Sequence, residues 1–166
     1  YPSINWMNSY SGYLADIAKW WSENISKDWL DIRSQTYGIL QREDTLKEIV
    51  KLLGPEALPD EEKLILEVAR MIKIGILQQN SFDDVDTYCS PEKQFKLMKL
   101  QVDFYNKGQQ ALKDGASLAD IRSMNVISLL LKARMDVKDD EMPKLDKIET
   151  DMIEQFNSVT GVKVEN

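Results

Sequence analysis

The side chains that can do chemistry in this sequence are mostly carboxylates, with 28 Asp and Glu against 21 Lys and Arg. Histidine is absent, which removes Ser–His and Cys–His nucleophile pairs and the commonest metal ligand. Cys89 is the single cysteine and has no histidine to activate it. We therefore interpret Cys89 as a small buried or half-buried residue in a chain from a reducing compartment.

One acidic cluster, formed by Asp83, Asp84 and Asp86, has the oxygen ligands that calcium or magnesium prefers. Acids in loops are more often turn-forming residues, so we predict no metal site there. The phosphate-binding patterns G-x-x-x-x-G-K-[ST] and G-x-G-x-x-G do not occur. No carboxylate is singled out as a general acid or base, so we predict that this segment alone has no catalytic residue.

A second acidic cluster lies in "LGPEALPDEEK", residues 53–63, which holds two prolines, four acids and the isolated Leu58. A plain connector needs only a few polar residues and a glycine. Pro55 and Pro59 each fix one φ angle, so this stretch is stiff as well as acidic. We predict an acidic helix–helix turn at residues 54–62.

The segments around these clusters have helical periodicity, and no alternating apolar run is long enough for a strand. We predict an all-α, multi-helix bundle and a single domain over residues 1–166. The polar run "QRED" predicts a helix break near Asp44. The expected apolar faces are Tyr13, Leu14, Ile17, Trp20 and Trp21; Trp29, Ile32, Ile39 and Leu40; Leu46, Ile49, Val50 and Leu53; Ile65, Val68, Ala69, Ile72 and Ile76; Phe95, Met98, Val102, Tyr105 and Leu112; and Leu145, Ile148, Met152, Phe156 and Val159.

Helix boundaries are predicted from capping residues. Ser26 or Asp28 is expected to cap the second helix, and Pro59 to stand in the first turn of the helix after the acidic turn. Residues 78–91 lack helical periodicity and form the one long irregular loop, which ends with Ser90 as N-cap and Pro91 at the first helical position. Short helices are expected over residues 118–124 and 126–135.

The net charge of −7 disfavours binding to nucleic acid or to an anionic membrane surface. No apolar run reaches the roughly 18–20 residues that a membrane span requires. We therefore predict no nucleic-acid partner and no membrane insertion. Because the chain begins at Tyr1, we expect it to be a piece of a longer protein.

Several stretches in order resemble one family. "YPSINWMNSYSGY", "LQREDTLKEIVKLLGPEALPDEEKLILEVARMI" and "LQQNSFDDVDTYCSPEKQ" are similar to the C-terminal helical domain of the catalytic A subunit of archaeal and vacuolar-type rotary ATPases. The similarity is continuous to about Tyr105 and looser through "GASLADIRSMNVISLLLKARM".

This resemblance implies that the chain is about the final quarter of a subunit that couples ATP hydrolysis or synthesis to central-stalk rotation and to proton or sodium transport. The P-loop, the catalytic glutamate and the magnesium ligands would then lie upstream of Tyr1. ATP or ADP with Mg is implied for the full-length subunit only. The implied partners are non-catalytic B subunits and central-stalk subunits, in a cytoplasmic head peripheral to the membrane.

The resemblance also assigns roles to residues. In this family, a helix–turn–helix of the domain presses on the central stalk. This implies that Glu56, Leu58, Asp60, Glu61 and Glu62 contact the stalk.

The irregular loop would form the adenine side of the ATP site. Phe82, Gln79 and Tyr88 are its candidates, and the resemblance does not decide which aromatic ring stacks on the base. The alternative is that both rings pack in the core.

A second hypothesis is a free-standing helical adaptor that binds a partner helix through a tryptophan-rich groove. Its candidates are Trp6, Trp20, Trp21 and Trp29, because tryptophan is enriched in interface hot spots. The ordered family motifs and the non-methionine start favour the first hypothesis.

Overall fold

The computed structural model describes residues 14–77 and 90–161, and within them it contains helices and no strand. The predicted all-α fold is confirmed. The α-helices are α2 (Leu14–Asn24), α3 (Trp29–Leu53), α4 (Asp60–Ile72), α5 (Pro91–Lys113), α6 (Leu118–Arg122), α7 (Asn125–Asp136) and α8 (Pro143–Thr160). Short 3-10 segments η1 (Pro55–Ala57) and η3 (Asp139–Glu141) and a π-helix η2 (Lys73–Leu77) complete them.

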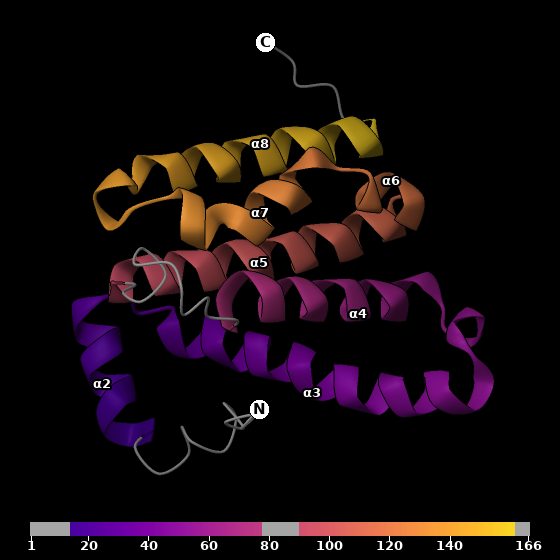
Figure 1. The fold of residues 1–166 in the computed structure, drawn as a ribbon, viewed down its shortest axis with the longest axis horizontal. Helices are drawn as coiled ribbons and strands as arrows, with labels where there is room; N and C mark the ends of the chain where they lie inside the picture. The colour runs from indigo at the N-terminus through magenta and orange to yellow at the C-terminus, as the bar shows by residue number, and fades with distance from the viewer. Residues whose placement is uncertain (1–13, 78–89, 162–166) are drawn as a thin grey trace.

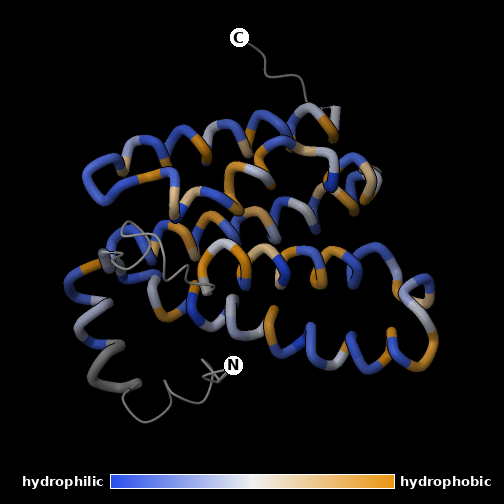
Figure 2. Tube along the Cα trace, viewed as in Figure 1, coloured by the Kyte–Doolittle hydropathy of each residue, from blue (hydrophilic) through white to orange (hydrophobic). Residues whose placement is uncertain are grey.

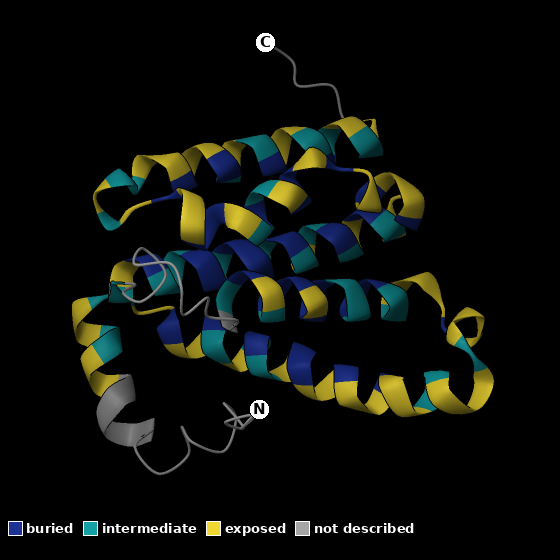
Figure 3. Cartoon of the chain, in the orientation of Figure 1, coloured by how far each residue is buried: buried dark blue, intermediate teal, exposed yellow. Residues whose placement is uncertain are grey.

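The longer helices lie side by side, and α2 turns away at the start of α3 (Figure 1). Helices α3 and α4 form an antiparallel hairpin, and α5 lies between α4 and α8. Apolar residues recur along each helix (Figure 2), and the buried residues line the sides that face neighbouring helices (Figure 3). One core cluster contains residues from α3, α4, α5, α7 and α8.

Helix α5 is buried on more than one side because it contacts α3, α4, α7 and α8. Phe104 is fully buried, and its ring centroid lies 5.2 Å from that of Phe156 on α8. Of the predicted face, Met98 and Val102 are buried, whereas Tyr105 is partly exposed. A single-face prediction fails for a helix that has neighbours on several sides.

The predicted start of α5 is confirmed. The Lys93 backbone N–H donates to Ser90 Oγ at 3.2 Å, and Pro91 occupies the first helical position. At the start of α3, Asp28 stands at the N-cap position without a side-chain cap hydrogen bond. Its backbone N–H instead donates to Ser26 Oγ at 3.1 Å, so neither predicted side chain caps the first turn of α3 directly.

The predicted helix break near Asp44 is wrong, because α3 continues through this position. Glu43 is only 3% exposed and pairs with Lys47 at 3.2 Å and with Lys73 of η2. Leu46 is fully buried in the next turn. The polar run is thus one buried, paired acid within an otherwise exposed stretch of helix.

Gly75, which costs about 1 kcal/mol relative to Ala in a helix, lies in the π-helix η2. A Cβ atom there would lie 3.1 Å from the Leu130 carbonyl oxygen and 3.1 Å from Gln101 Nε2. Close packing of η2 against α5 and α7 therefore favours a residue without a side chain at this position.

The described tryptophans pack α2 against α3. Trp21 stacks on Trp29 with ring centroids 5.3 Å apart, and Trp20 meets Trp21 edge-on at 5.8 Å. Trp29 is 3% exposed, whereas Trp20 is 47% exposed. Trp6 lies outside the described residues. Trp21 and Trp29 thus pack against each other within the fold, and Trp20 is the most exposed of the three rings.

Candidate functional site: an acidic corner and the ends of a loop

The predicted acidic turn is a short corner between α3 and α4, built around the 3-10 turn η1. Helix α3 ends at Leu53 and is capped by Gly54, whose φ of +85° suits glycine and whose N–H donates to the Val50 carbonyl at 2.8 Å. The 3-10 turn Pro55–Ala57 follows, closed by a 3.3 Å hydrogen bond from the Leu58 N–H to the Pro55 carbonyl.

Pro59 stands just before α4, one position earlier than predicted, with φ −66°. Its carbonyl accepts hydrogen bonds at 3.0 Å from the backbone N–H groups of Glu62 and Lys63. The proline ring removes rotation about φ, and these bonds tie the corner to the first turn of α4. The corner is therefore stiff for two independent reasons.

Leu58 is buried in the core, with 5% of its surface exposed. The expected apolar contact between Leu58 and a partner is not available in this structure, because the side chain anchors the corner to the hairpin. The sequence did not indicate this, because the burial of Leu58 depends on how the corner packs against the core cluster.

Two leucines that we did not predict as contact residues are exposed beside the corner. Leu52 is 83% and Leu53 is 72% exposed at the end of α3. Leu53 was expected on the apolar face with Leu46, which is fully buried. The sequence carried no local signal for their exposure, because other adjacent apolar pairs, such as Ile39 with Leu40 and Met71 with Ile72, are both buried.

The acids of the corner are all accessible to a partner. Asp60 and Glu61 are exposed and form no ion pair within residues 14–77 and 90–161. Glu62 pairs with Arg42 at 2.9 Å, and Glu56, whose side chain is 92% exposed, pairs with Lys63 at 3.2 Å. Exposed pairs of this kind contribute about 0–1 kcal/mol, so a partner's cations can replace them at small cost.

The predicted adenine-side residues Gln79, Phe82 and Tyr88 lie outside the described residues, as do Cys89 and the cluster Asp83, Asp84 and Asp86. The structure does describe both flanks of residues 78–89. In the described part of the chain, no group of three or more acidic or cysteine side chains is arranged to hold a metal ion.

The flanks of this loop are held by buried polar residues. The fully buried Lys93 donates from Nζ to the Arg134 carbonyl at 2.7 Å. Arg134, also buried, donates from Nη1 to the carbonyl of Ile76 on the preceding flank. Side chains from α5 and α7 thus connect the residues before and after the loop.

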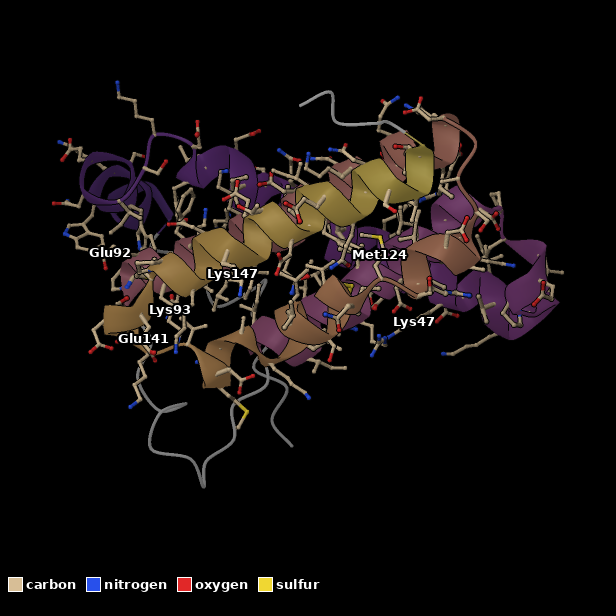
Figure 4. The ribbon with its side chains drawn as sticks, turned by 90° about the horizontal axis from the view of Figure 1, so that it is seen from above. Lys47, Glu92, Lys93, Met124, Glu141 and Lys147 are labelled. Atoms are coloured by element: carbon tan, nitrogen blue, oxygen red, sulfur yellow. The ribbon has the colours of Figure 1, made fainter. Side chains whose placement is uncertain are left out.

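The segment before α8 contacts the second flank. Asp139 Oδ1 accepts a hydrogen bond from the Ser90 N–H at 3.3 Å. Nearby, hydrogen bonds from the Lys144 side chain and the Lys138 backbone lower the pKa of Glu141. Figure 4 shows Lys93 and Glu141 at one end of the bundle and Lys47 toward the other. The corner and the loop flanks are therefore separate sites.

The fold and these two sites define an all-helical domain that presents a stiff acidic corner. A family model described as the C-terminal domain of V and A type ATP synthase matches residues 18–122. The chain belongs to this family, as its sequence motifs predicted.

Relatives extend the similarity over nearly the whole chain. The chain is 45% identical over 165 residues to the A subunit of the A-type ATP synthase from Hyperthermus butylicus, covering 98% of this chain and 28% of the relative. It is 48% identical over 126 residues to the A subunit of the A-type ATP synthase from Methanococcus maripaludis, covering 76% and 22%. It is 38% identical over 157 residues to the V-type ATP synthase alpha chain of Halothermothrix orenii, covering 95% and 27%. The chain thus matches only between 22% and 28% of the length of these relatives.

None of the helices in the described ranges is long and apolar enough to cross a membrane.

Proposed function

We propose that this chain serves as the C-terminal domain of the catalytic subunit of an A- or V-type ATP synthase. In this proposal the corner contacts the central stalk and transmits force between ATP turnover and rotation. The observation that carries it is the corner itself, which is stiff, exposed and acidic at the end of a long helical hairpin (Figure 1). Family membership supports the same assignment.

The structure of the corner fits a force-transmitting role. Flexible connectors absorb displacement, whereas a corner with two prolines and a buried anchor moves with its helices. Leu58 supplies the anchor, and the Pro59 carbonyl binds the first turn of α4. A displacement at the corner is therefore passed into α3 and α4, which pack on the central helix α5.

The chemistry of the corner fits a partner surface that is basic and partly apolar. Asp60 and Glu61 offer unpaired carboxylates, judged over the described ranges, and Glu56 and Glu62 offer weakly held ones. Leu52 and Leu53 replace Leu58 as the apolar contact in this proposal, because they are exposed and Leu58 is not.

We further propose that residues 78–91 line the adenine side of the ATP site, with Phe82, Gln79 and Tyr88 as its candidates. Stacking on a base contributes about 1–3 kcal/mol in nucleic-acid systems. The hydrogen bonds donated by Lys93 and Arg134, and the one that Asp139 accepts from Ser90, support this proposal because they fix the residues on either side of this stretch. ATP or ADP with Mg would bind the complete subunit, whose remaining parts would hold the phosphates.

The complete subunit would pair with non-catalytic B subunits in a head peripheral to the membrane, on its cytoplasmic side, and would drive proton or sodium transport. These partners follow from the proposed identity of the domain.

The test of the corner is the double substitution Pro55→Gly with Pro59→Gly in the complete subunit of the assembled complex. Two freed φ angles should soften the corner, so we expect a severalfold lower yield of ion transport per ATP hydrolysed. The measurement is the ratio of ion transport to ATP hydrolysis in reconstituted vesicles.

The matched control is Pro143→Gly, at the exposed first position of α8, which should leave that ratio unchanged. An unchanged ratio in the corner variant, with the complex fully assembled, would contradict the proposed role of stiffness.

A further inference from the structure

The buried cation Arg134, in the last turn of α7, bonds to both flanks of residues 78–89. Its Nη1 donates to the carbonyl of Ile76, which lies in η2 on the preceding flank. Its backbone carbonyl accepts a hydrogen bond of 2.7 Å from Nζ of Lys93, which lies in the first turn of α5 on the following flank. One residue of α7 therefore connects the two flanks, and we call Ile76, Lys93 and Arg134 the clasp.

Both bonds of the clasp satisfy a carbonyl near the end of a helix. Ile76 lies in the last turn of η2 and Arg134 in the last turn of α7, where backbone carbonyls have no donor within their own helix. Cationic side chains are favourable at such ends because they face the negative end of the helix dipole. Three elements are thus linked in series, since α5 supplies the cation for the end of α7 and α7 supplies the cation for the end of η2.

Lys93 itself is unfavourable for stability at its position. It is fully buried, and among the residues that the structure describes it forms no ion pair. Removing a charge from water without a carboxylate partner is costly. Lys93 also occupies the third position of α5, beside the positive end of that helix dipole, where a cation is disfavoured. An apolar side chain would fill the same space without these two costs, so stability alone does not explain a lysine here.

The clasp is built on a rigid part of the core. Leu130 is almost fully buried one turn before Arg134. The preceding flank packs directly on this turn, since a Cβ atom on Gly75 would lie 3.1 Å from the Leu130 carbonyl oxygen. Beyond α7, Asp139 Oδ1 accepts a hydrogen bond of 3.3 Å from the Ser90 N–H on the following flank. The end of α7 therefore sets the positions of both flanks.

We propose that Arg134 and Lys93 are positioning residues for nucleotide binding by the complete subunit. They act through the flanks and do not touch the nucleotide, because they hold the two ends of residues 78–89 in the arrangement in which this stretch meets the base. If loss of one clasp bond leaves that arrangement in about one molecule in five, the apparent Kd for ATP rises about fivefold. This inference rests on the adenine-side role proposed above for residues 78–91.

The test uses Arg134→Met and Lys93→Met in the complete subunit of the assembled complex. Methionine keeps the apolar bulk of each side chain and removes its charged donor. We expect KM and Kd for ATP to rise about three- to tenfold, with kcat changed by less than about twofold. Arg134→Lys keeps a donor and should restore part of the affinity. The measurements are steady-state hydrolysis and titration with a fluorescent ATP analogue.

Magnesium tripolyphosphate, which has no base, separates positioning from general damage to the site. Its inhibition constant should be unchanged in both variants, because only the base side of the site is loosened. Discrimination between ATP and GTP should fall severalfold for the same reason. A loss of tripolyphosphate affinity as large as the loss of ATP affinity would show that the whole site is damaged, and it would overturn the inference.

The matched control is Gln155→Met on α8. Gln155 Oε1 accepts a hydrogen bond of 3.0 Å from the Val126 N–H at the other end of α7, so this substitution removes a side-chain bond to the same helix. It should leave KM, Kd and ATP–GTP discrimination within about twofold. Thermal unfolding of each complete subunit checks the fold. Lys93→Met should keep Tm within about 3 °C, because it removes a buried charge together with its hydrogen bond.

The outcomes separate this inference from the adenine-side proposal. If Phe82→Ala or Tyr88→Ala raises the Kd for ATP and neither clasp variant does, the inference is wrong and the adenine-side proposal stands. If neither the aromatic variants nor the clasp variants change Kd, both fail together. Equal rises in Gln155→Met would also overturn the inference. So would effects of Arg134→Met and of the active aromatic substitution that multiply in full, since the cation would then act independently of this stretch.

Discussion

At the scale of single residues, the leucines of the corner have two different roles. Leu58 anchors the corner in the core, whereas Leu52 is exposed for contact with a partner. Leu58 is 5% exposed and Leu52 is 83% exposed, although only six positions separate them. Burial of a leucine removes its apolar surface from water and fills space that would otherwise be a cavity. The two side chains should therefore differ sharply in their contribution to stability.

We expect Leu58→Ala to lower the free energy of unfolding by about 2–4 kcal/mol. Leu52→Ala is the matched control and should change it by less than about 0.5 kcal/mol. Urea unfolding followed by far-UV circular dichroism measures both. Equal effects from the two substitutions would mean that Leu58 does not anchor the corner.

These residues also show what a sequence reveals at this scale. The cap formed by Ser90 and Pro91 was predictable because both its donor and its acceptor lie within four positions. The roles of Leu58 and Leu53 were not, because the exposure of each side chain depends on how α3 and α4 pack at the corner. Local hydrogen-bonding rules predict where a helix begins or ends, whereas the exposure of a side chain can be known only from the packed structure.

At the scale of elements, α5 and α8 are joined by a charged cluster at the edge of the core. Lys96 of α5 binds both Asp146 and Glu149 of α8, and its side chain is 18% exposed. Burial alone would lower the pKa of Lys96, but hydrogen bonds with Glu149 and Asp146 outweigh burial and raise it. Protonated Lys96 is therefore favoured by the folded state.

The raised pKa fixes the sign of a pH dependence. Because the folded protein holds this proton more tightly, the stabilisation is complete below the unfolded lysine pKa of about 10.4 and is lost as pH rises through the folded value. We expect Lys96→Met to reduce stability by about 0.5–1 kcal/mol at pH 7, and the difference from the unchanged protein to shrink as the pH rises beyond the unfolded lysine pKa.

Urea unfolding at a series of pH values measures this difference. The control is Lys132→Met, an exposed cation of α7 whose substitution should have little effect at any pH. A loss in Lys96→Met that stays constant into the alkaline range would mean that the side chain acts through packing alone.

Apolar periodicity in the sequence did not predict every helix boundary correctly. The break predicted near Asp44 does not exist, because Glu43 is buried through its pairing with Lys73, thirty positions away. The π-helix over residues 73–77 could not be predicted from the sequence either. It depends on the close packing of α5 and α7 around Gly75, which only the tertiary structure shows. The all-α class was predictable because most helices have a strong apolar stripe.

At the scale of the whole molecule, the corner and the loop flanks lie at opposite ends of one rod. Helix α4 begins at the corner, and η2 continues it to the flank at Ile76 (Figure 1). The residues from Asp60 to Leu77 span about 27 Å at 1.5 Å per residue. A movement at one end can therefore reach the other through continuous helix, although each end has its own chemistry.

This separation predicts which kinetic parameter each end controls in the complete subunit. Phe82→Ala should raise the KM for ATP, by about tenfold if one stacking contact of roughly 1.4 kcal/mol is lost, with a smaller effect on kcat. Tyr88→Ala is its parallel variant, because either ring is a candidate.

The Pro55 and Pro59 double substitution should leave KM unchanged and lower only the coupling ratio. In the combined variant both effects should appear at full size, since sites this far apart are usually additive. Steady-state ATP hydrolysis together with ion transport measures all three quantities. If neither aromatic substitution changed KM or nucleotide affinity, the adenine-side assignment of residues 78–91 would be wrong, while the assignment of the corner would stand on its own measurement.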